Sequence, residues 1–211
     1  GARAGDGARG GAPGVIRQNK ESNWGFFRPT GPTLPELMSK AGYHTGMVGK
    51  WHLGYSSPNL PNDHGFDFFD GFLGDMMDDY WTHLRGGVNW MRKNKEVIKP
   101  KGHATEIFSQ WAIDYMKEQS ADKKKPFFLY LAYNAPHFPI QPPKDWLEKV
   151  RKREPQLSQK RATNVAFVEH MDHEIGKVLD AVGELGIEKD TLITFSSDNG
   201  GGASNAPLQG G

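Results

Sequence analysis

The chain has 211 residues and contains no cysteine. This absence excludes disulfide bonds, thiolate metal sites and a cysteine nucleophile within the chain. There is no run of about 18 apolar residues, and no basic segment followed by an apolar one at the N-terminus, so neither a membrane span nor a signal peptide is recognisable. Lys and Arg together number 26 and Asp and Glu 25, and this near balance gives no indication of a nucleic-acid partner.

Apolar residues are scarce at both ends. Residues 1–14, GARAGDGARGGAPG, are almost wholly Gly, Ala, Arg, Asp and Pro. Such a segment buries too little apolar surface to offset the entropy of ordering, so we expect it to be disordered or artefactual. Residues 200–211 are also glycine-rich. A truncated or mis-assembled reading frame would explain both ends.

Between the ends, helical and strand patterns alternate. Thr33 and Glu36 have the spacing of a capping box, which predicts a short helix over residues 34–41 that Gly42 ends. Runs of apolar residues predict strands over 43–53, 127–133 and 191–196. Apolar residues at helical spacing predict helices over 104–118 and 162–185. The uninterrupted apolar strand runs suit strands buried on both faces. Residues 54–103 show no clear period and predict an insertion of loops and short strands.

This alternation predicts an α/β fold with a mainly parallel sheet and helices on its faces. Ligands of such sheets bind beyond the carboxyl ends of the strands. Three predicted strands end in polar residues, at Lys50-Trp51-His52, at His137 and at Asp198-Asn199.

The segment GKWHLG, residues 49–54, places Lys50 and His52 two residues apart. In an extended strand this spacing puts both side chains on the same face. Together they could bind an anion and move a proton near neutral pH. On its own, Lys-x-His is a weak signal that favours an exposed lysine beside a hydrogen-bonded histidine.

The other two strand ends are also ambiguous when each is taken alone. His137 lies between Pro136 and Pro139 and could be a turn histidine. Asp198 and Asn199 could form an ordinary turn or supply oxygen ligands to Ca²⁺ or Mg²⁺. Residues able to bind an anion, transfer a proton and bind a cation follow three predicted strands, and this combination favours a functional site.

Two further clusters have simpler interpretations. His170 and His173 lie one helical turn apart, but the apolar stripe predicts that they are solvated at its flank. The segment DMMDDY, with Asp75, Asp78 and Asp79, is typical of a capped turn rather than a metal site, and a substrate-facing role stays open.

With these residues assembled, the chain resembles the type I sulfatases, the arylsulfatase family of the alkaline-phosphatase-like superfamily. GYHTGMVGKWHLG, residues 42–54, fits the second signature of that family nearly throughout. Further similar blocks follow in the same order, namely NDHGFDFFDGFLG, FFLYLAYNAPHFP, HMDHEIGKVLDAV with TLITFSSDNGG, and SNAPLQGG. The resemblance implies a three-layer sandwich, incomplete at both ends, with residues 15–211 forming part of a sulfatase N-terminal catalytic domain.

The resemblance also implies roles for the residues that match. Lys50 would bind the sulfate and the nucleophile, and His52 would hydrogen-bond the hydroxyl of the nucleophile. His137 would contact the sulfate and help to protonate the leaving oxygen. Asp198 and Asn199 would be two ligands of a calcium ion.

This sequence departs from the family pattern at the nucleophile. The family makes a formylglycine from Cys or Ser in a C/S-x-P-x-R motif, which is absent here, as are the paired N-terminal aspartates of the calcium site and the lysine after the final Gly-Gly. We therefore expect the full-length protein, but not this chain alone, to hydrolyse a sulfated small molecule or polysaccharide. The family resemblance implies a periplasmic or extracellular location. The alternatives are a phosphomonoesterase or phosphodiesterase of the same superfamily and a non-catalytic anion-binding module.

Overall fold

The computed structural model describes residues 29–123 and 125–198. Its main sheet has five strands in the order β6-β5-β2-β1-β7. The strands β1 (His44–Lys50), β2 (Phe68–Phe72) and β7 (Phe127–Ala132) are parallel to one another. The short strands β5 (Met91–Lys93) and β6 (Glu96–Val97) add antiparallel pairs at the β2 side. The parallel centre of the sheet agrees with the fold class that the sequence predicts.

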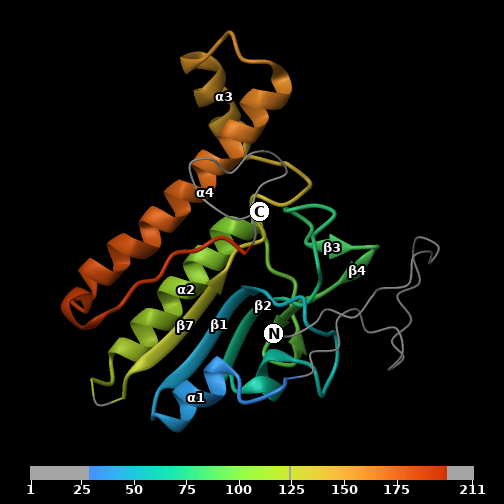
Figure 1. Cartoon of the computed structure of the whole chain (residues 1–211). Coiled ribbons are helices and arrows are strands. Elements are labelled where there is room, and N and C mark those ends of the chain that lie inside the picture. The colour runs from blue at the N-terminus through green and yellow to red at the C-terminus, as the bar shows by residue number, and fades with distance from the viewer. Residues whose placement is uncertain (1–28, 124, 199–211) are drawn as a thin grey trace.

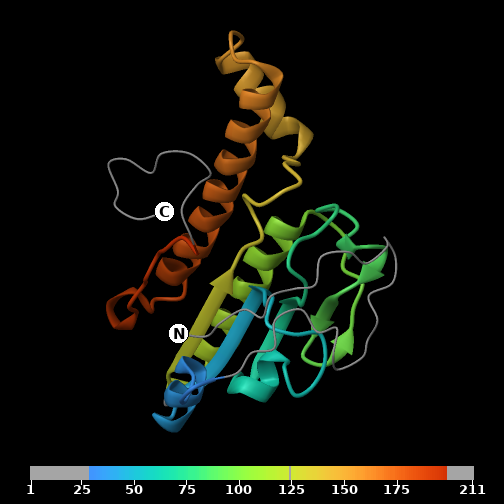
Figure 2. The ribbon, with the colours of Figure 1, turned by 45° about the vertical axis from the view of Figure 1, so that its right-hand side comes forward.

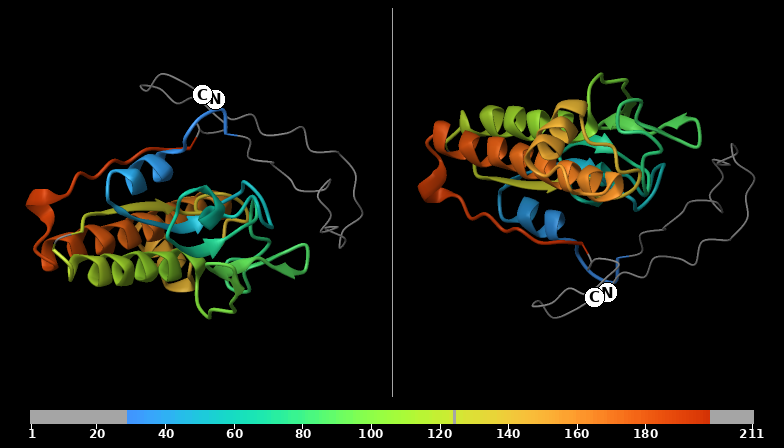
Figure 3. Two further views of the ribbon diagram at one scale, coloured as in Figure 1. Left: turned by 90° about the horizontal axis from the view of Figure 1, so that it is seen from below. Right: turned by 90° about the horizontal axis from the view of Figure 1, so that it is seen from above.

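Helices cover both faces of this sheet and make three layers. The helix α1 (Leu34–Lys40) lies on one face, and α2 (Ala104–Ser120) and α4 (Gln159–Glu184) lie on the other (Figure 3). The core forms where the sheet meets these helices, and its fully buried residues include Met47, Phe69 and Phe108. No helix in the described part of the chain is long and apolar enough to cross a membrane.

Local sequence signals explain where the helices begin. Thr33 and Glu36 form both hydrogen bonds of the capping box before α1, as the spacing predicts. At α2, Nδ1 of His103 accepts a hydrogen bond from the Thr105 N–H, so a histidine serves as the N-cap. Ser158 caps α4 by accepting from the Arg161 N–H. Each cap satisfies a backbone donor that the helix leaves free.

A pair of antiparallel helices projects from the body of the molecule. The helix α3 (Lys144–Arg153) packs on the first turns of α4 through Val150, Ala162 and Ala166. Figures 1 and 2 show this pair extending past the sheet, and residues 144–166 are called the helical arm below. The sequence pattern did not predict α3.

The remaining elements are short. A two-stranded hairpin comprises β3 (Leu84–Arg85) and β4 (Val88–Asn89), with Gly86 and Gly87 at its turn. The 3-10 turns η1 (Pro61–His64) and η2 (Glu188–Asp190) follow β1 and α4. The region 54–103 thus contains more structure than predicted, because β2 is a central strand of the main sheet.

Two predictions about buried strands are wrong. The strand β7 is half-buried rather than buried on both faces, because it is the edge strand among the described residues, and Tyr130 on it is 50% exposed. Residues 191–196 are not a strand, and Leu192 is 92% exposed. This segment runs back from η2 towards the ends of β1 and β7 without joining the sheet (Figure 1). Its apolar residues remain exposed because no described strand pairs with it.

The buried face of α4 also differs from the predicted apolar stripe. Val168 and Leu179 of that stripe are exposed, whereas His170, predicted as solvated, is buried, and so is Glu174. The buried positions Ala162, Ala166, His170 and Glu174 follow one another at intervals of four residues. The helix therefore contacts its neighbours along an i, i+4 row that includes polar residues.

A buried carboxylate on β2 makes stability depend on pH. Asp70 is 5% exposed, and its Oδ1 has no hydrogen-bond partner among the described residues. Burial raises the pKa of Asp70 to about 6, and the charge of Lys93 opposes this rise. In the unfolded chain the carboxyl loses its proton near its ordinary pKa of 3.8, so the folded state loses relative stability as the pH rises from about 4 to about 6.

We expect Asp70→Asn to remove this cost. The variant should exceed the parent in free energy of unfolding by about 2–3 kcal/mol near pH 8, and the difference should vanish below about pH 3, where the carboxyl is protonated in both states. Urea denaturation at both pH values measures this. The exposed Asp172→Asn serves as the control and should show no such pH-dependent gain. A difference that does not change with pH would contradict the assignment.

Candidate functional site

The carboxyl end of β1 is held by close backbone contacts. Gly49 has φ 108, and a Cβ atom placed on it would lie 2.0 Å from the carbonyl oxygen of Ala132 on β7. Only glycine allows this conformation and this approach. Beyond the strand, the Trp51 N–H donates to Phe72 O, and Trp51 Nε1 donates to Asn59 O at 2.7 Å. These contacts fix the backbone that carries Lys50 and His52.

His52 does not continue the strand. The strand β1 ends at Lys50, and His52 has φ 56, in the left-handed region. The expectation that period two places Lys50 and His52 on the same face of an extended strand is therefore wrong. The backbone turns after Trp51, and the His52 N–H donates to Leu73 O at 3.2 Å, next to β2.

The second strand end places His137 on an exposed loop. The His137 N–H donates to Asn134 O, and the carbonyl of His137 accepts from Oη of Tyr80 at 3.0 Å. Nδ1 of the ring lies 3.0 Å from Phe138 O, which leaves Nε2 directed away from this local contact. Proline residues on both sides restrict the backbone of the loop.

Lys50 lies within electrostatic reach of two carboxylates on other segments of the chain. Burial lowers the pKa of Lys50, and the negative charges of Asp198 and Asp75 oppose that shift. Both carboxylates therefore lie within electrostatic reach of the ammonium group. Asp198 follows residues 191–196, so the segment reaches the end of β1 even though it is not a strand.

His52 is the electrostatic centre of the group. Its pKa is lowered first by burial and then by the positive charge of Lys50. Asp75 opposes this shift, whereas His137 and Arg85 add to it. The structure thus brings Lys50, His52 and His137 together at one edge of the sheet, and their roles are taken up below.

Asp75 and Arg85 belong to this group although the sequence pattern did not single out Arg85. Nε and one terminal nitrogen of Arg85 each lie 3.0 Å from an oxygen of Asp75, and the other terminal nitrogen lies 2.9 Å from Asp78. This two-point contact fixes the β3-β4 hairpin at the rim of the site. No periodic signal links residues 75 and 85, so only the folded structure reveals the pair.

The segment DMMDDY also fastens the His137 loop. Oδ1 of Asp79 accepts from the N–H groups of Trp81 and Thr82, which is the capped turn that the sequence predicts. Oδ2 of Asp79 accepts from Nε2 of Gln141, whose Oε1 accepts from the Tyr80 N–H. Both polar atoms of the Gln141 side chain therefore hydrogen-bond to this turn, and they hold the loop between β7 and α3 in place.

The described residues do not form a metal site by themselves. They contain no group of three or more His, Asp or Glu side chains arranged to hold a metal ion. Asp198 is described, whereas Asn199 lies outside the described residues. Calcium takes about six to eight oxygen ligands. Asp198 would therefore supply one ligand among several.

A second histidine cluster lies inside the molecule. The rings of His103 and His170 are 4.7 Å apart between centroids, and Nε2 of His170 lies 3.2 Å from Glu106. Burial lowers the pKa of both histidines to about 4. His83, also buried, contacts Gly102 O through Nε2. These histidines are neutral near pH 7 and connect α2, α4 and the Gln141 loop as structural residues.

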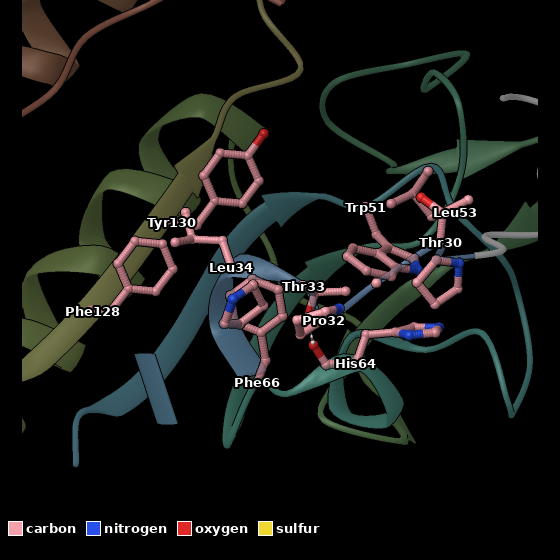
Figure 4. Close-up of a pocket in the computed structure, with 13 residues that line it drawn as sticks. Thr30, Pro32, Thr33, Leu34, Trp51, Leu53, His64, Phe66, Phe128 and Tyr130 are labelled. Carbon is pink, nitrogen blue, oxygen red and sulfur yellow. Dashed lines mark hydrogen bonds between the residues drawn. The ribbon is translucent and has the colours of Figure 1, made fainter. Parts of the chain in front are cut away.

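An apolar pocket of about 470 Å³ lies on the α1 face of the sheet (Figure 4). Trp51, Leu53, Phe66, Phe128 and Tyr130 contribute to its lining, and Oγ1 of Thr33 donates to His64 O at its base. Trp51 and Leu53 flank His52 in sequence. The lining contains no Lys, Arg, Asp or Glu and a single histidine, His64, so the pocket has too few charged groups or ligands to suit a sulfate or a metal ion.

Comparison with known proteins identifies the family. The family model described as Sulfatase matches residues 15–211. The chain belongs to the sulfatase family. Arylsulfatase J of Mus musculus is 35% identical over 207 residues, which cover 88% of this chain and 33% of that protein. N-acetylgalactosamine-6-sulfatase of Rattus norvegicus is 32% identical over 189 residues, which cover 84% of this chain and 34% of that protein.

Solved sulfatase structures share the fold. The structure of Ps i-CgsB in complex with k-i-k-neocarrahexaose has a TM-score of 0.73 and 32% identity, and the match covers 84% of this chain and 43% of that one. The fold is accordingly an alkaline-phosphatase-like α/β sandwich. This sulfatase chain spans about a third of the length of the curated relatives it matches.

Proposed function

We propose that this chain is part of the catalytic domain of a sulfatase that hydrolyses sulfate esters, with Lys50, His52 and His137 as catalytic residues. The observation that carries the proposal is that His52 lies within electrostatic reach of both Lys50 and His137 at the carboxyl edge of the sheet. Membership of the sulfatase family supports the choice of sulfate as the anion.

The chemistry of sulfate esters explains the need for these residue types. Cleavage of the S–O bond builds negative charge on the leaving oxygen, which positively charged donors stabilise. Lys50 would bind a sulfate oxygen as a cation, and His137 would contact the sulfate and donate a proton to the leaving oxygen. His52, with its pKa lowered by burial and by Lys50, is neutral at pH 7 and can accept a hydrogen bond from an attacking hydroxyl.

The family's chemistry also uses a formylglycine nucleophile and a calcium ion. A formylglycine would provide the attacking hydroxyl, and this chain has no nucleophile motif to form one. Calcium would be held in part by Asp198 and Asn199. Because Asp198 is the one described ligand and Ca²⁺ needs several more oxygens, we derive the roles above from Lys50, His52 and His137 alone.

The proposed substrate class is a sulfated saccharide. The relatives include an N-acetylgalactosamine-6-sulfatase, and the structure of Ps i-CgsB contains a neocarrahexaose. Sulfated polysaccharide is compatible with the open edge on which His137 is exposed. We also propose a periplasmic or extracellular location, where such polymers occur.

The alternative functions use the same anion-binding residues. A phosphomonoesterase or phosphodiesterase of the superfamily would need two zinc ions, and the described residues lack a cluster of His and Asp ligands for them. A non-catalytic anion-binding module would need only Lys50, His52 and His137. The missing nucleophile motif keeps this second alternative open for the isolated chain.

An activity assay with two esters separates these functions. We expect the chain extended at both ends to the family's length to turn over an aryl sulfate, with calcium present, at least a hundredfold faster than an aryl phosphate. The chain alone should turn over neither ester. Faster turnover of the phosphate, stimulated by zinc, would favour the phosphatase alternative. No turnover of either ester by the extended protein would leave the binding module.

A further inference from the structure

The helical arm carries a concentration of positive charge. Residues 144–161 contain seven Lys or Arg and three Asp or Glu, whereas the whole chain balances 26 against 25. All seven cationic residues are exposed. The excess of positive over negative residues therefore lies on this projecting element, and the rest of the chain has more acidic than basic residues.

Most of these cationic side chains form no salt bridge with the described residues. Lys149 lies 3.6 Å from Asp145, and Arg153 pairs with Glu169 at 2.6 Å. The other five form no salt bridge with any residue of the described ranges, and they are Lys144, Arg151, Lys152, Lys160 and Arg161. Four of these five lie at the tip, where α3 ends and α4 begins. A ligand could meet them without breaking an existing ion pair.

Helix electrostatics separates these four cations into two kinds. Arg151 and Lys152 occupy the last turn of α3, where the helix dipole favours cations. Lys160 and Arg161 occupy the first turn of α4, where the dipole disfavours them by about 0.3–1 kcal/mol each, and that turn has no acidic residue. Arg161 also stands at the position after the Ser158 cap where a glutamate would complete a capping box. The stability of α4 therefore does not account for these two residues.

The arm lies on the same side of the molecule as the candidate active site. The carboxyl ends of β1 and β7 point towards the arm, and residues 133–143 lead from β7 past His137 into α3 (Figures 1 and 2). Gln141 fixes this connection to Tyr80 and Asp79. A polymer that extends from the site along this connection would reach the tip of the arm.

We propose that the tip of the arm binds the anionic groups of a sulfated polysaccharide at a distance from the ester that is hydrolysed. This proposal rests on the proposed sulfatase function for its choice of polyanion. Exposed guanidinium and ammonium groups pair well with sulfate groups repeated along a chain. Residues Arg151, Lys152, Lys160 and Arg161 hold the polymer, and the strand ends hold the reacting ester.

Nucleic acid fits the arm less well. Base stacking requires an accessible aromatic ring. Nζ of Lys149 lies over the ring of Trp146, 4.1 Å from its centroid, and the ring also packs against His170 and His173. Phe167, next to the arm, is fully buried. The arm thus offers charge without a stacking surface.

The test is the affinity of this chain for dextran sulfate, with uncharged dextran as the blank. We expect Lys160→Glu together with Arg161→Glu to weaken binding at least tenfold and to make it less sensitive to salt. The thermal midpoint should not fall, because the carboxylate introduced at position 161 would complete the capping box with Ser158, and both new carboxylates suit a helix N-terminus. Loss of binding could then not be attributed to unfolding.

A matched control carries the same change in net charge elsewhere. Lys123→Glu with Lys189→Glu alters two exposed lysines at the opposite end of α2 and α4, and should weaken binding less than twofold. Equal weakening by both pairs, or unchanged binding in the arm variant, would overturn the proposal. Single-stranded DNA that binds as tightly as dextran sulfate would also overturn it, in favour of a nucleic-acid surface.

Turnover separates this proposal from the proposed function. In the protein extended to the family's length, the arm variant should raise KM for a sulfated polymer at least fivefold and leave turnover of a small aryl sulfate unchanged. Unchanged KM for the polymer would overturn the role of the arm while the sulfatase assignment stands. Absence of all sulfatase activity would overturn the assignment, and the dextran sulfate measurement would remain valid.

Discussion

Gly49→Ala is expected to lower the free energy of unfolding by about 3–5 kcal/mol, among the largest effects of a single substitution. The residue has φ 108, which costs an L-amino acid about 1–2 kcal/mol. The added Cβ would lie 2.0 Å from Ala132 O, a backbone atom that cannot rotate away. The pairing of β1 with β7 would have to separate at the residue before Lys50.

Urea denaturation of the chain measures this loss. Gly86→Ala is the matched control, because Gly86 also has a positive φ of 57 but no atom within 4 Å of an added Cβ. The control should lose only about 1 kcal/mol, the cost of the backbone conformation alone. Equal losses in both variants would show that contact with β7 is not what requires glycine at position 49.

Lys50→Ala should reduce kcat for an aryl sulfate about 10²–10³-fold in the protein extended to the family's length. The half-buried ammonium group of Lys50 is the positive charge that we propose to bind the sulfate. Its removal would also take away the positive charge that lies within electrostatic reach of Asp75 and Asp198. Both effects weaken the binding of negative charge at this edge, so the loss should appear in kcat/KM as well.

Two comparisons make this loss specific to position 50. Lys99→Ala removes an exposed lysine that forms no salt bridge within the described ranges and should leave kcat within twofold of the parent. Lys50→Arg keeps the charge and should recover part of the activity, although a guanidinium differs in shape from an ammonium. Activity of Lys50→Ala within fivefold of the parent would remove Lys50 from the catalytic residues.

Local sequence signals predicted the helices α1, α2 and α4 and two of the three polar strand ends, whereas Asp198 follows a segment that is not a strand. The capping box at Thr33, the strand before Lys50 and the long helix ending near Gly186 all depend on residues close together in the chain. The polar strand ends could be grouped because parallel strands end at one edge of a sheet. These inferences need no knowledge of tertiary packing.

The wrong or missing predictions all depend on contacts between distant segments. Residues 191–196 are apolar, but an apolar run is buried only where a neighbour covers it, and no described strand pairs with this segment. The strand β2 contains Asp70 and Gly71, which hide its strand character in the sequence. The turn at His52 follows from its hydrogen bond to Leu73, next to β2.

The candidate site shows the same limit. Arg85 lies on a hairpin whose position is set by Asp75 and Asp78, ten and seven residues earlier, and no pattern in the sequence links them. The burial of His170 depends on the rings of His103 and Trp146, which lie on other elements. Spacing along one helix could not distinguish this residue from the exposed His173.

The length of α4 has a mechanical consequence. At about 1.5 Å per residue, the 26 residues of this helix span about 39 Å. One end carries Lys160 and Arg161, and beyond the other end η2 leads into the segment that carries Asp198. His170 lies 3.2 Å from Glu106 near the middle of the helix, and Ala181 and Val182 pack against Met116 near its far end, so α4 is anchored on α2 over that length. The arm is thus a rigid extension of the helix layer, and the same helix fixes both the tip of the arm and the start of the segment that leads to Asp198.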